Sequence, residues 1–325
     1  MAHRAFVTLD PPLIAARQPF CHKPLGDESP YQLNYLGGHF PAVEKIICAI
    51  NAAFGVVLQP DAKLYRPFVW DFIASLWVYV TVPLVESLRG GSQISLTTLI
   101  PVQFAAQALT GGVVLPVFWI LLLFRLPREA KGETISKGNA ESIVFAITYG
   151  YLFISIILLL RPTVGMIILW QVFPLVVGGL IVLYPRLSSH STSRWHTPGN
   201  DLIYSLYALI FITSTTTHLH SLLSLDYSFA KLVHMWIPRM VAPIPGDSPA
   251  ALMVDILQWD AAVIFGSMMI AATWLTAKSS RERIIIVGWC VVGSVLVGPG
   301  GALSVVWWWR EKRLLVGAAQ SGQRS

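Results

Sequence analysis

The stretch PFVWDFIASLWVYVTVPLVESL, residues 67–88, decides the class of fold. It is largely apolar, its acidic residues are Asp71 and Glu86, and it contains no lysine or arginine. An apolar run of about 20 residues can cross the hydrocarbon core of a bilayer as an α-helix. A helix suits such a stretch because lipid offers no hydrogen-bond partner for an open sheet edge. We therefore predict a membrane-spanning helix here.

The rest of the chain shares this shortage of charge. Of its 325 residues, 54% are hydrophobic and only 12% are charged, about half of the roughly 25% that is usual in a soluble domain. The net charge is +6, and most lysines and arginines lie between apolar runs, where such residues commonly set the orientation of a membrane protein. This composition excludes an ordinary soluble enzyme, and we expect no nucleic-acid partner.

Further apolar stretches are also long enough to span a bilayer. Together they predict an all-α, polytopic integral membrane helical bundle with seven transmembrane helices, at residues 67–88, 96–124, 142–160, 164–183, 202–223, 250–276 and 284–309. A shorter apolar segment, residues 46–58, is an interfacial helix or an eighth span. We divide the chain into an N-terminal arm, a transmembrane catalytic bundle and a polar C-terminal tail, at residues 1–63, 64–309 and 310–325.

Acidic residues inside the predicted spans are the main candidates for function. Asp71, Asp255 and Asp260 lie within apolar runs, and the interiors of the predicted spans contain no lysine or arginine. A charged aspartate at the bilayer centre costs about 2.5–3.5 kcal/mol, so such residues are rare and usually functional. A carboxyl group in an apolar site without a basic partner keeps its proton. We therefore expect neutral carboxylic acids that can donate a proton.

These acids differ in their surroundings. Asp255 and Asp260 lie five residues apart, about 140° around a helix, and so point in different directions. We favour Asp260, because Asp255 lies nearer the start of its helix, where the helix dipole alone would favour an acid. Glu86 follows Pro83 by one turn and would face the cavity of Asp71 only if the helix is kinked. For Asp71 and Asp260, a structural role as an acid bonded to a neighbouring helix is the alternative.

Tryptophans accompany the acids in two of the predicted spans. Trp70 and Trp77 lie near Asp71, and Trp259 and Trp274 flank the other acid-containing run. The electron-rich face of an indole ring can stabilise a cation in a dry site by about 2 kcal/mol. We predict that these four rings bind substrate or a cationic intermediate, with core packing as the alternative.

The histidines give no metal signature. His218 and His220 lie near the end of a predicted span, but residues two apart on a helix point in nearly opposite directions and cannot both bind one metal ion. Neither HExxH nor a multi-histidine box occurs. We interpret both as polar residues at a helix end and expect neither a metal nor another cofactor.

Together these features resemble the membrane-bound terpene cyclases of fungal meroterpenoid pathways, and most of all those of the ascochlorin, ascofuranone and macrophorin type. The resemblance covers residues 64–309 and rests on two stretches in which a tryptophan precedes an acid, Trp70 with Asp71 and Trp259 with Asp260. It implies that Asp71 or Asp260 starts the cyclisation. The motifs DDxxD, DxDD and NDxxD are absent, which disfavours ionisation of a diphosphate by magnesium.

The resemblance implies an integral membrane terpene cyclase of the endoplasmic reticulum. It would protonate the terminal alkene or epoxide of a farnesyl (meroterpenoid) substrate and cyclise it through a carbocation cascade. Its partners would be an apolar prenylated small molecule and the lipid bilayer, with no obligate protein partner. The alternatives are a seven-span transporter or receptor that uses its acids as relay sites, and a lipid-modifying hydrolase or desaturase, for which no GxSxG or histidine-box motif occurs.

Overall fold

A computed structural model describes most of the chain, at residues 39–58, 62–90, 92, 94–125, 134–187, 197–224, 229–239 and 249–322. The described residues form helices and no strand, apart from one isolated bridge between Ser136 and Pro198. The predicted all-α class is therefore confirmed for this part of the chain. Residues 1–38 of the predicted N-terminal arm lie outside it, and the predicted segment 46–58 lies within helix α2, Pro41–Leu58.

Five helices are long and apolar enough to cross a membrane. They are α3 (Arg66–Leu88), the run α6, η1 and α7 (Lys137–Ile147, Thr148–Leu152 and Phe153–Leu160), α10 (Asn200–Ser224), α12 (Pro249–Thr276) and α13 (Ser280–Gly322). These helices support an integral membrane protein, as the composition predicts.

The predicted count of seven or eight spans is not confirmed, because two of the predicted spans are broken. Helices α8 (Val164–Gln171) and α9 (Phe173–Leu187) are bent by 60° and add a sixth span only if they are taken as one. The predicted span 96–124 consists of two short helices, α4 (Leu96–Leu109) and α5 (Gly111–Arg125). They meet at Thr110, whose φ of 81° cannot continue a helix.

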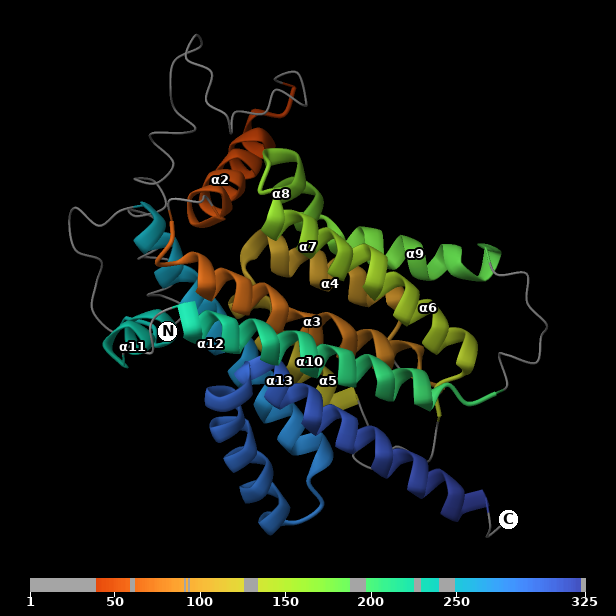
Figure 1. Cartoon of the computed structure of the whole chain (residues 1–325). Coiled ribbons are helices and arrows are strands. Elements are labelled where there is room, and N and C mark those ends of the chain that lie inside the picture. Colours follow the sequence, from red (N-terminus) through yellow and green to blue (C-terminus); the bar gives the residue numbers. More distant parts are fainter. Residues whose placement is uncertain are drawn as a thin grey trace.

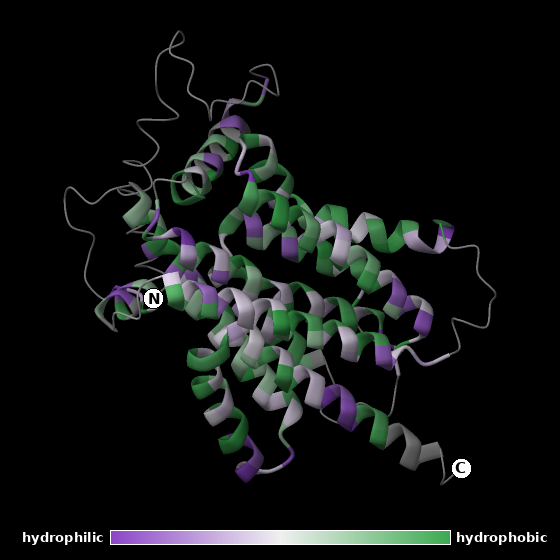
Figure 2. Ribbon diagram, in the orientation of Figure 1, coloured by the Kyte–Doolittle hydropathy of each residue, from purple (hydrophilic) through white to green (hydrophobic). Residues whose placement is uncertain are grey.

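Helix α3 forms the centre of the bundle (Figure 1). In the most apolar 18-residue stretch of α3, 89% of the residues are buried, against 33–44% in the corresponding stretches of the other four long helices. It packs against α10 and the second half of α13. Large apolar side chains on the other long helices, such as Ile212, Ile270 and Ile284, remain exposed, and Figure 2 shows apolar residues over much of the helical surface. The residues of α3 are therefore placed to form an interior site, whereas those outer faces suit contact with lipid.

A sharp kink divides α13 at Gly298, which has φ 79° and ψ 157°. The next residue, Pro299, has no N–H, so it cannot donate the usual helical hydrogen bond to the carbonyl of Val295. This backbone conformation is essentially restricted to glycine. In addition, a Cβ atom at Gly298 would lie only 3.0 Å from the Cβ atom of His218. The kink therefore leaves the carbonyl oxygen of Val295 without its helical donor, next to His218.

We expect Gly298→Ala to lower the free energy of unfolding by about 1–3 kcal/mol, the usual cost of a side chain in such a conformation. Unfolding in detergent micelles, followed by circular dichroism, measures this change. Gly288→Ala is the matched control, since a Cβ atom at Gly288, in the same helix, would face open space within 4 Å. Equal stability of the two variants would contradict a need for glycine at the kink.

The predicted boundary between the bundle and the polar tail, after residue 309, lies inside helix α13. Helix α13 continues to Gly322, and Arg310 and Glu311, predicted to lie in the tail, are only 4% and 0% exposed. The residues on either side of the predicted boundary at 309 and 310 therefore belong to one helix and pack against the bundle.

Candidate active site

Asp71 on α3 lies at a point where three helices meet. Its Oδ2 atom is 2.8 Å from Nδ1 of His218 on α10, and it accepts a hydrogen bond of 2.9 Å from Nε1 of Trp236 on α11 (Phe229–Trp236). Asp71 and His218 are each only 2% exposed. Two expectations from the sequence are therefore corrected: Asp71 has a basic partner, and His218, interpreted as a polar residue at a helix end, is a buried partner of an acid.

The kink in α13 determines which nitrogen of His218 carries hydrogen. Nε2 of His218 lies 3.1 Å from the carbonyl oxygen of Val295, the carbonyl that loses its helical donor because of Pro299. A carbonyl oxygen can only accept, so Nε2 must carry the hydrogen. Nδ1 therefore faces Asp71 either as an acceptor, in a neutral ring, or as a donor, in a cationic ring. The Asp71–His218 pair can thus hold a proton in a buried place.

The second carboxyl oxygen of Asp71 has no hydrogen-bond partner in the described part of the chain. Oδ1 is buried and unpaired among the described residues, although a buried polar atom normally has a partner. Since Oδ2 already contacts His218 and Trp236, Oδ1 is the atom that remains available to a bound molecule. This arrangement suits an acid that donates its proton from one oxygen while the other is held.

Trp236, which binds Asp71, belongs to a cluster of packed aromatic rings. The ring of Trp236 contacts those of His218 and Phe68, with centroids 5.7 and 6.4 Å apart. Phe72, the next residue after Asp71, packs against Phe68 at 6.1 Å and against Phe265 on α12 at 6.4 Å. These side chains provide an apolar surface next to the acid, with ring faces that can stabilise positive charge.

The four tryptophans predicted from the sequence have other positions. Trp70 packs against His220 and under the guanidinium of Arg66. Trp77 is buried in the core at 1% exposure, and Trp274 is 44% exposed. Trp259 donates its Nε1 hydrogen to the carbonyl of residue 239 at 3.2 Å. Binding of substrate or a cation by these four rings stays a prediction. The ring that donates a hydrogen bond to Asp71 is that of Trp236, which was not predicted from the sequence.

Asp260, a residue of α12, lies beside the first turn of α5. Its Oδ1 atom accepts a short hydrogen bond from the backbone N–H of Gly112, and a Cβ atom at Gly112 would lie 2.7 Å from that oxygen. A carboxylate at a helix N-terminus satisfies free N–H groups and interacts favourably with the helix dipole. This geometry is that of a helix cap, and it matches the alternative given for Asp260 from the sequence, an acid bonded to a neighbouring helix.

Asp255 and its neighbours on α12 hold the end of α11. Asp255 accepts a hydrogen bond of 3.3 Å from the backbone N–H of Arg239. Nε2 of Gln258 donates to the carbonyls of His234 and Met235, at 2.8 and 2.7 Å. Carbonyls at a helix C-terminus lack helical partners, so these bonds fix the end of α11. They thereby position Trp236, the residue after Met235, against Asp71.

Glu86 belongs to a buried cluster of charges at the far end of α3. Arg310 donates two hydrogen bonds to its carboxylate, at 2.7 and 3.2 Å, and Arg89 donates one at 3.1 Å. Arg89 also pairs with Glu311. Burial alone lowers the pKa of the Arg89 guanidinium, but the carboxylates of Glu86 and Glu311 raise it above its usual value. The prediction that the acids lack basic partners is therefore wrong for Glu86.

The titratable side chains that the structure describes do not gather into a metal site. Within the described ranges, no group of three or more histidine, cysteine, aspartate or glutamate side chains could hold one metal ion. His218 faces Asp71, whereas His220 packs against Trp70. The predicted divergence of the two histidines is therefore observed in the structure.

The chain belongs to the CtvD domain family, whose pattern matches residues 26–315. It is similar to the FAD-dependent monooxygenase verC1 of Penicillium polonicum, with 25% identity over 272 residues that cover 74% of this chain and 31% of that protein. The chain thus spans about a third of the length of this curated relative. No solved structure matches the chain. These matches confirm the predicted resemblance at the level of the family, and the cyclase activity stays a prediction.

Proposed function

We propose that this protein is a terpene cyclase of the endoplasmic reticulum membrane that acts on a prenylated, meroterpenoid-type substrate. Asp71 protonates the terminal epoxide or alkene of a farnesyl chain, and rings close through a carbocation cascade. The observation that carries the proposal is the buried Asp71 carboxyl, with Oδ2 bound by His218 and Trp236 and with Oδ1 unpaired among the described residues. We also propose that the chain crosses the membrane seven times.

The geometry supports a defined proton transfer. When the ring of His218 is cationic, Nδ1–H donates to Oδ2, and the proton of a neutral Asp71 lies on Oδ1. This proton leaves Oδ1 and binds the epoxide oxygen, whose bond to the more substituted carbon breaks and leaves a cation on that carbon. The π electrons of the next double bond attack this cation and form a ring. The last cation loses a proton, and the product is an isomer of the substrate. Trp236 and His218 stabilise the carboxylate left on Asp71, because hydrogen bonds to a charged group favour its charged form.

The aromatic cluster supports the later steps. Trp236 binds Asp71 and packs against Phe68, which packs against Phe72, and aromatic faces stabilise a desolvated cation by about 2 kcal/mol. They cannot trap it as a nucleophilic carboxylate or water would. An apolar, aromatic site next to a single acid is therefore suited to a cation that must survive several bond-forming steps.

The comparisons support an oxidised substrate. The relative verC1 is named as an FAD-dependent monooxygenase and is about three times as long as the matched segment. We attribute the oxidation to the part of that relative outside the match, and the step after it to the segment that resembles this chain. Since a monooxygenase can convert an alkene to an epoxide, this order favours protonation of an epoxide. It also supports a role in fungal secondary metabolism.

Product analysis tests the proposal. Microsomes that contain the protein are incubated with farnesyl hydroquinone, with and without a terminal epoxide, and products are separated by liquid chromatography and mass spectrometry. We expect a cyclised isomer with the mass of the substrate. In D2O, protonation of an alkene places deuterium on carbon, whereas protonation of an epoxide places it on an exchangeable oxygen. Unchanged substrates in the presence of folded protein would contradict the proposal and favour the transporter or receptor alternative.

Asp260→Asn tests whether Asp260, and not Asp71, is the proton donor. Asp260 caps α5, and asparagine caps a helix about as well as aspartate. We therefore expect only the interaction of the charge with the helix dipole to be lost, at most about 1 kcal/mol in stability. Turnover per folded molecule should stay within about twofold of the unaltered protein. Thermal unfolding in detergent and product formation, normalised to folded protein, measure the two effects. Loss of turnover without loss of stability would make Asp260 the proton donor.

A further inference from the structure

Residues 295–301 of α13, here called the kink segment, contain the stretch VGPGG and lie against α3 and α10. Thr215 on α10 donates a hydrogen bond of 3.3 Å to the carbonyl of Val297. Ser75 on α3 accepts one of 3.3 Å from the backbone N–H of Gly300. The kink segment is therefore bonded to a hydroxyl group on each of the two helices.

Both hydroxyl groups lie one turn from the Asp71–His218 pair. Ser75 follows Asp71 by four residues on α3, and Thr215 precedes His218 by three residues on α10, so each lies on the same side of its helix as its partner in the pair. We propose that Ser75 and Thr215 are positioning residues, which hold the kink segment so that the carbonyl of Val295 meets Nε2 of His218. The inference rests on the proposed function and adds to it the residues that orient the partner of Asp71.

The kink segment approaches α3 closely because Gly300 has no side chain. A Cβ atom at Gly300 would lie 2.6 Å from the Cα atom of Ser75 and 2.8 Å from Oγ of Ser214, and the backbone of α3 could not yield to such a clash. Ser214 in turn donates a hydrogen bond of 3.0 Å to the carbonyl of Ala74. The three helices α3, α10 and α13 are thus joined to one another within one turn of the acid and its histidine.

The proposed proton transfer needs the carbonyl of Val295. A cationic imidazole donates from both nitrogens, so Nε2–H of His218 needs an acceptor while Nδ1–H donates to Asp71. A buried donor without an acceptor is unfavourable. Without this carbonyl the ring would turn, or would carry its hydrogen on Nδ1 when neutral. The kink segment therefore keeps both the orientation and the tautomer of the ring.

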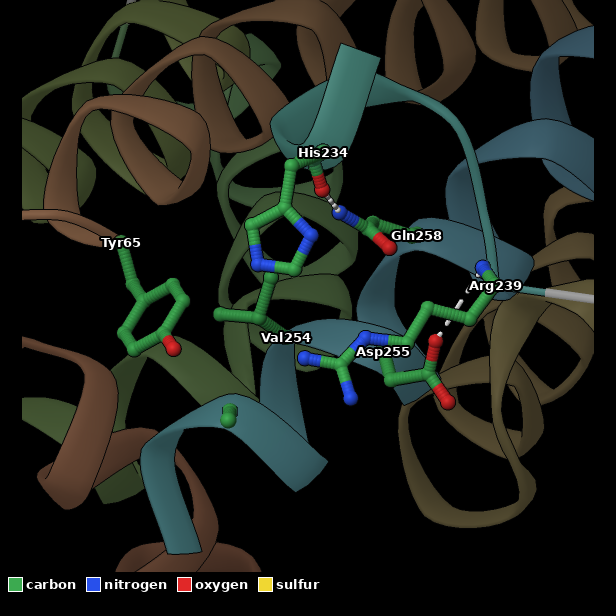
Figure 3. Close-up of a pocket in the computed structure, with 7 residues that line it drawn as sticks. Tyr65, His234, Arg239, Val254, Asp255 and Gln258 are labelled. Atoms are coloured by element: carbon green, nitrogen blue, oxygen red, sulfur yellow. Dashed lines mark hydrogen bonds between the residues drawn. The ribbon is translucent and has the colours of Figure 1, made fainter. Parts of the chain in front are cut away.

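The second donor to Asp71 is held separately. Trp236 belongs to α11, and Figure 3 shows the hydrogen bonds from α12 that fix the end of that helix, those of Gln258 and Asp255. These bonds do not involve the kink segment. A variant that releases the kink segment should therefore disturb His218 and leave Trp236 in place.

Paired variants on the same helices test the inference. Ser75→Ala with Thr215→Val removes both hydroxyl groups and should lower kcat about tenfold, with KM within twofold, because even a small misplacement of a reacting group slows the chemical step. Ser87→Ala with Thr217→Val is the matched control, since these hydroxyl groups bond to carbonyls of their own helices. Thr215→Ser, which keeps the hydroxyl, should stay within twofold of the unaltered protein. Equal turnover per folded molecule in the two double variants of an active enzyme would overturn the inference.

The tautomer of His218 gives a measurement that does not depend on catalysis. The full chain with 15N-labelled histidine, in lipid nanodiscs, is studied by NMR, and the signals of His218 are identified by their loss in His218→Gln. In the unaltered protein and in the control, Nε2 should carry hydrogen at every pH. In Ser75→Ala with Thr215→Val, the neutral ring should also show hydrogen on Nδ1. An unchanged tautomer in that variant would overturn the inference alone, whereas a changed tautomer in a protein that forms no product would overturn only the proposed function.

Discussion

Asp71→Asn is expected to reduce cyclisation by about 10²- to 10⁴-fold, the range that a positioned general acid contributes. The substitution keeps the shape of the side chain and its place beside His218 and Trp236, but an amide cannot deliver a proton to an epoxide or an alkene. The rate of product formation in microsomes, divided by the amount of folded protein, measures the effect. Folded protein is quantified by fluorescence-detected size-exclusion chromatography.

The control for this variant is Asp201→Asn. Asp201 is an exposed acid in the first turn of α10, so its replacement removes the same charge without touching the buried site. We expect turnover within twofold of the unaltered protein. If Asp71→Asn retained the turnover of Asp201→Asn, Asp71 could not be the proton donor, and Asp255 or Glu86 would have to be tested next.

The position of Asp71 could be predicted from the sequence because it follows from local pattern alone. Residues 67–88 are predicted to span as a helix, and α3 covers Arg66–Leu88. An acid inside such an apolar run is expected to face the interior of the bundle, whichever helices pack there. The predicted span 250–276 likewise agrees with α12, Pro249–Thr276, since both stretches are apolar, long and bounded by polar residues.

The partners of Asp71 could not be predicted in the same way, because they come from distant parts of the chain. His218 and Trp236 lie 147 and 165 residues away. One signal was available, however: Ser214, His218 and Ser221 recur at spacings of four and three residues in α10, on one face of the helix. Ser214, His218 and Ser221 are all buried. A polar face on a spanning helix indicates that it packs against polar groups, here Asp71 and the backbone carbonyls of Pro67 and Ala74 on α3.

The predicted helix boundaries explain why the partners of Glu86 were missed. The predicted spans end at residues 88 and 309, so Arg89 and Arg310, each one residue further, fall in a predicted loop and a predicted tail. Their side chains extend back into the bundle and reach Glu86. Arginine has a long side chain that can bury its stem while its charged head finds a partner. A basic residue just outside a span can therefore neutralise an acid several residues inside it.

The buried cluster around Glu86 leads to the second large effect that we expect. Arg310→Met removes two hydrogen bonds and one positive charge from a site in which Glu86 is 2% exposed and Arg310 4% exposed. Breaking a buried ion pair by removal of one partner costs about 3–5 kcal/mol. Here the variant leaves two buried carboxylates, Glu86 and Glu311, with Arg89 alone, so one negative charge stays buried without compensation. The loss is measured as the free energy of unfolding in mixed detergent micelles with increasing SDS.

Arg313→Met provides a closely matched control on the same helix. Arg313 also donates two hydrogen bonds to one carboxylate, that of Glu282, at 2.9 and 2.7 Å. The side chains of this pair are 23% and 26% exposed, and partly exposed pairs contribute about 0–1 kcal/mol. Because both variants lose an arginine with two hydrogen bonds, the difference between their free energies of unfolding measures the effect of burial on the ion pair. Adding Glu86→Gln to Arg310→Met should restore part of the lost stability, since it removes the unpaired charge. Equal losses in the two arginine variants would show that the Glu86 cluster is solvated, and Glu86 would again be a candidate for proton transfer.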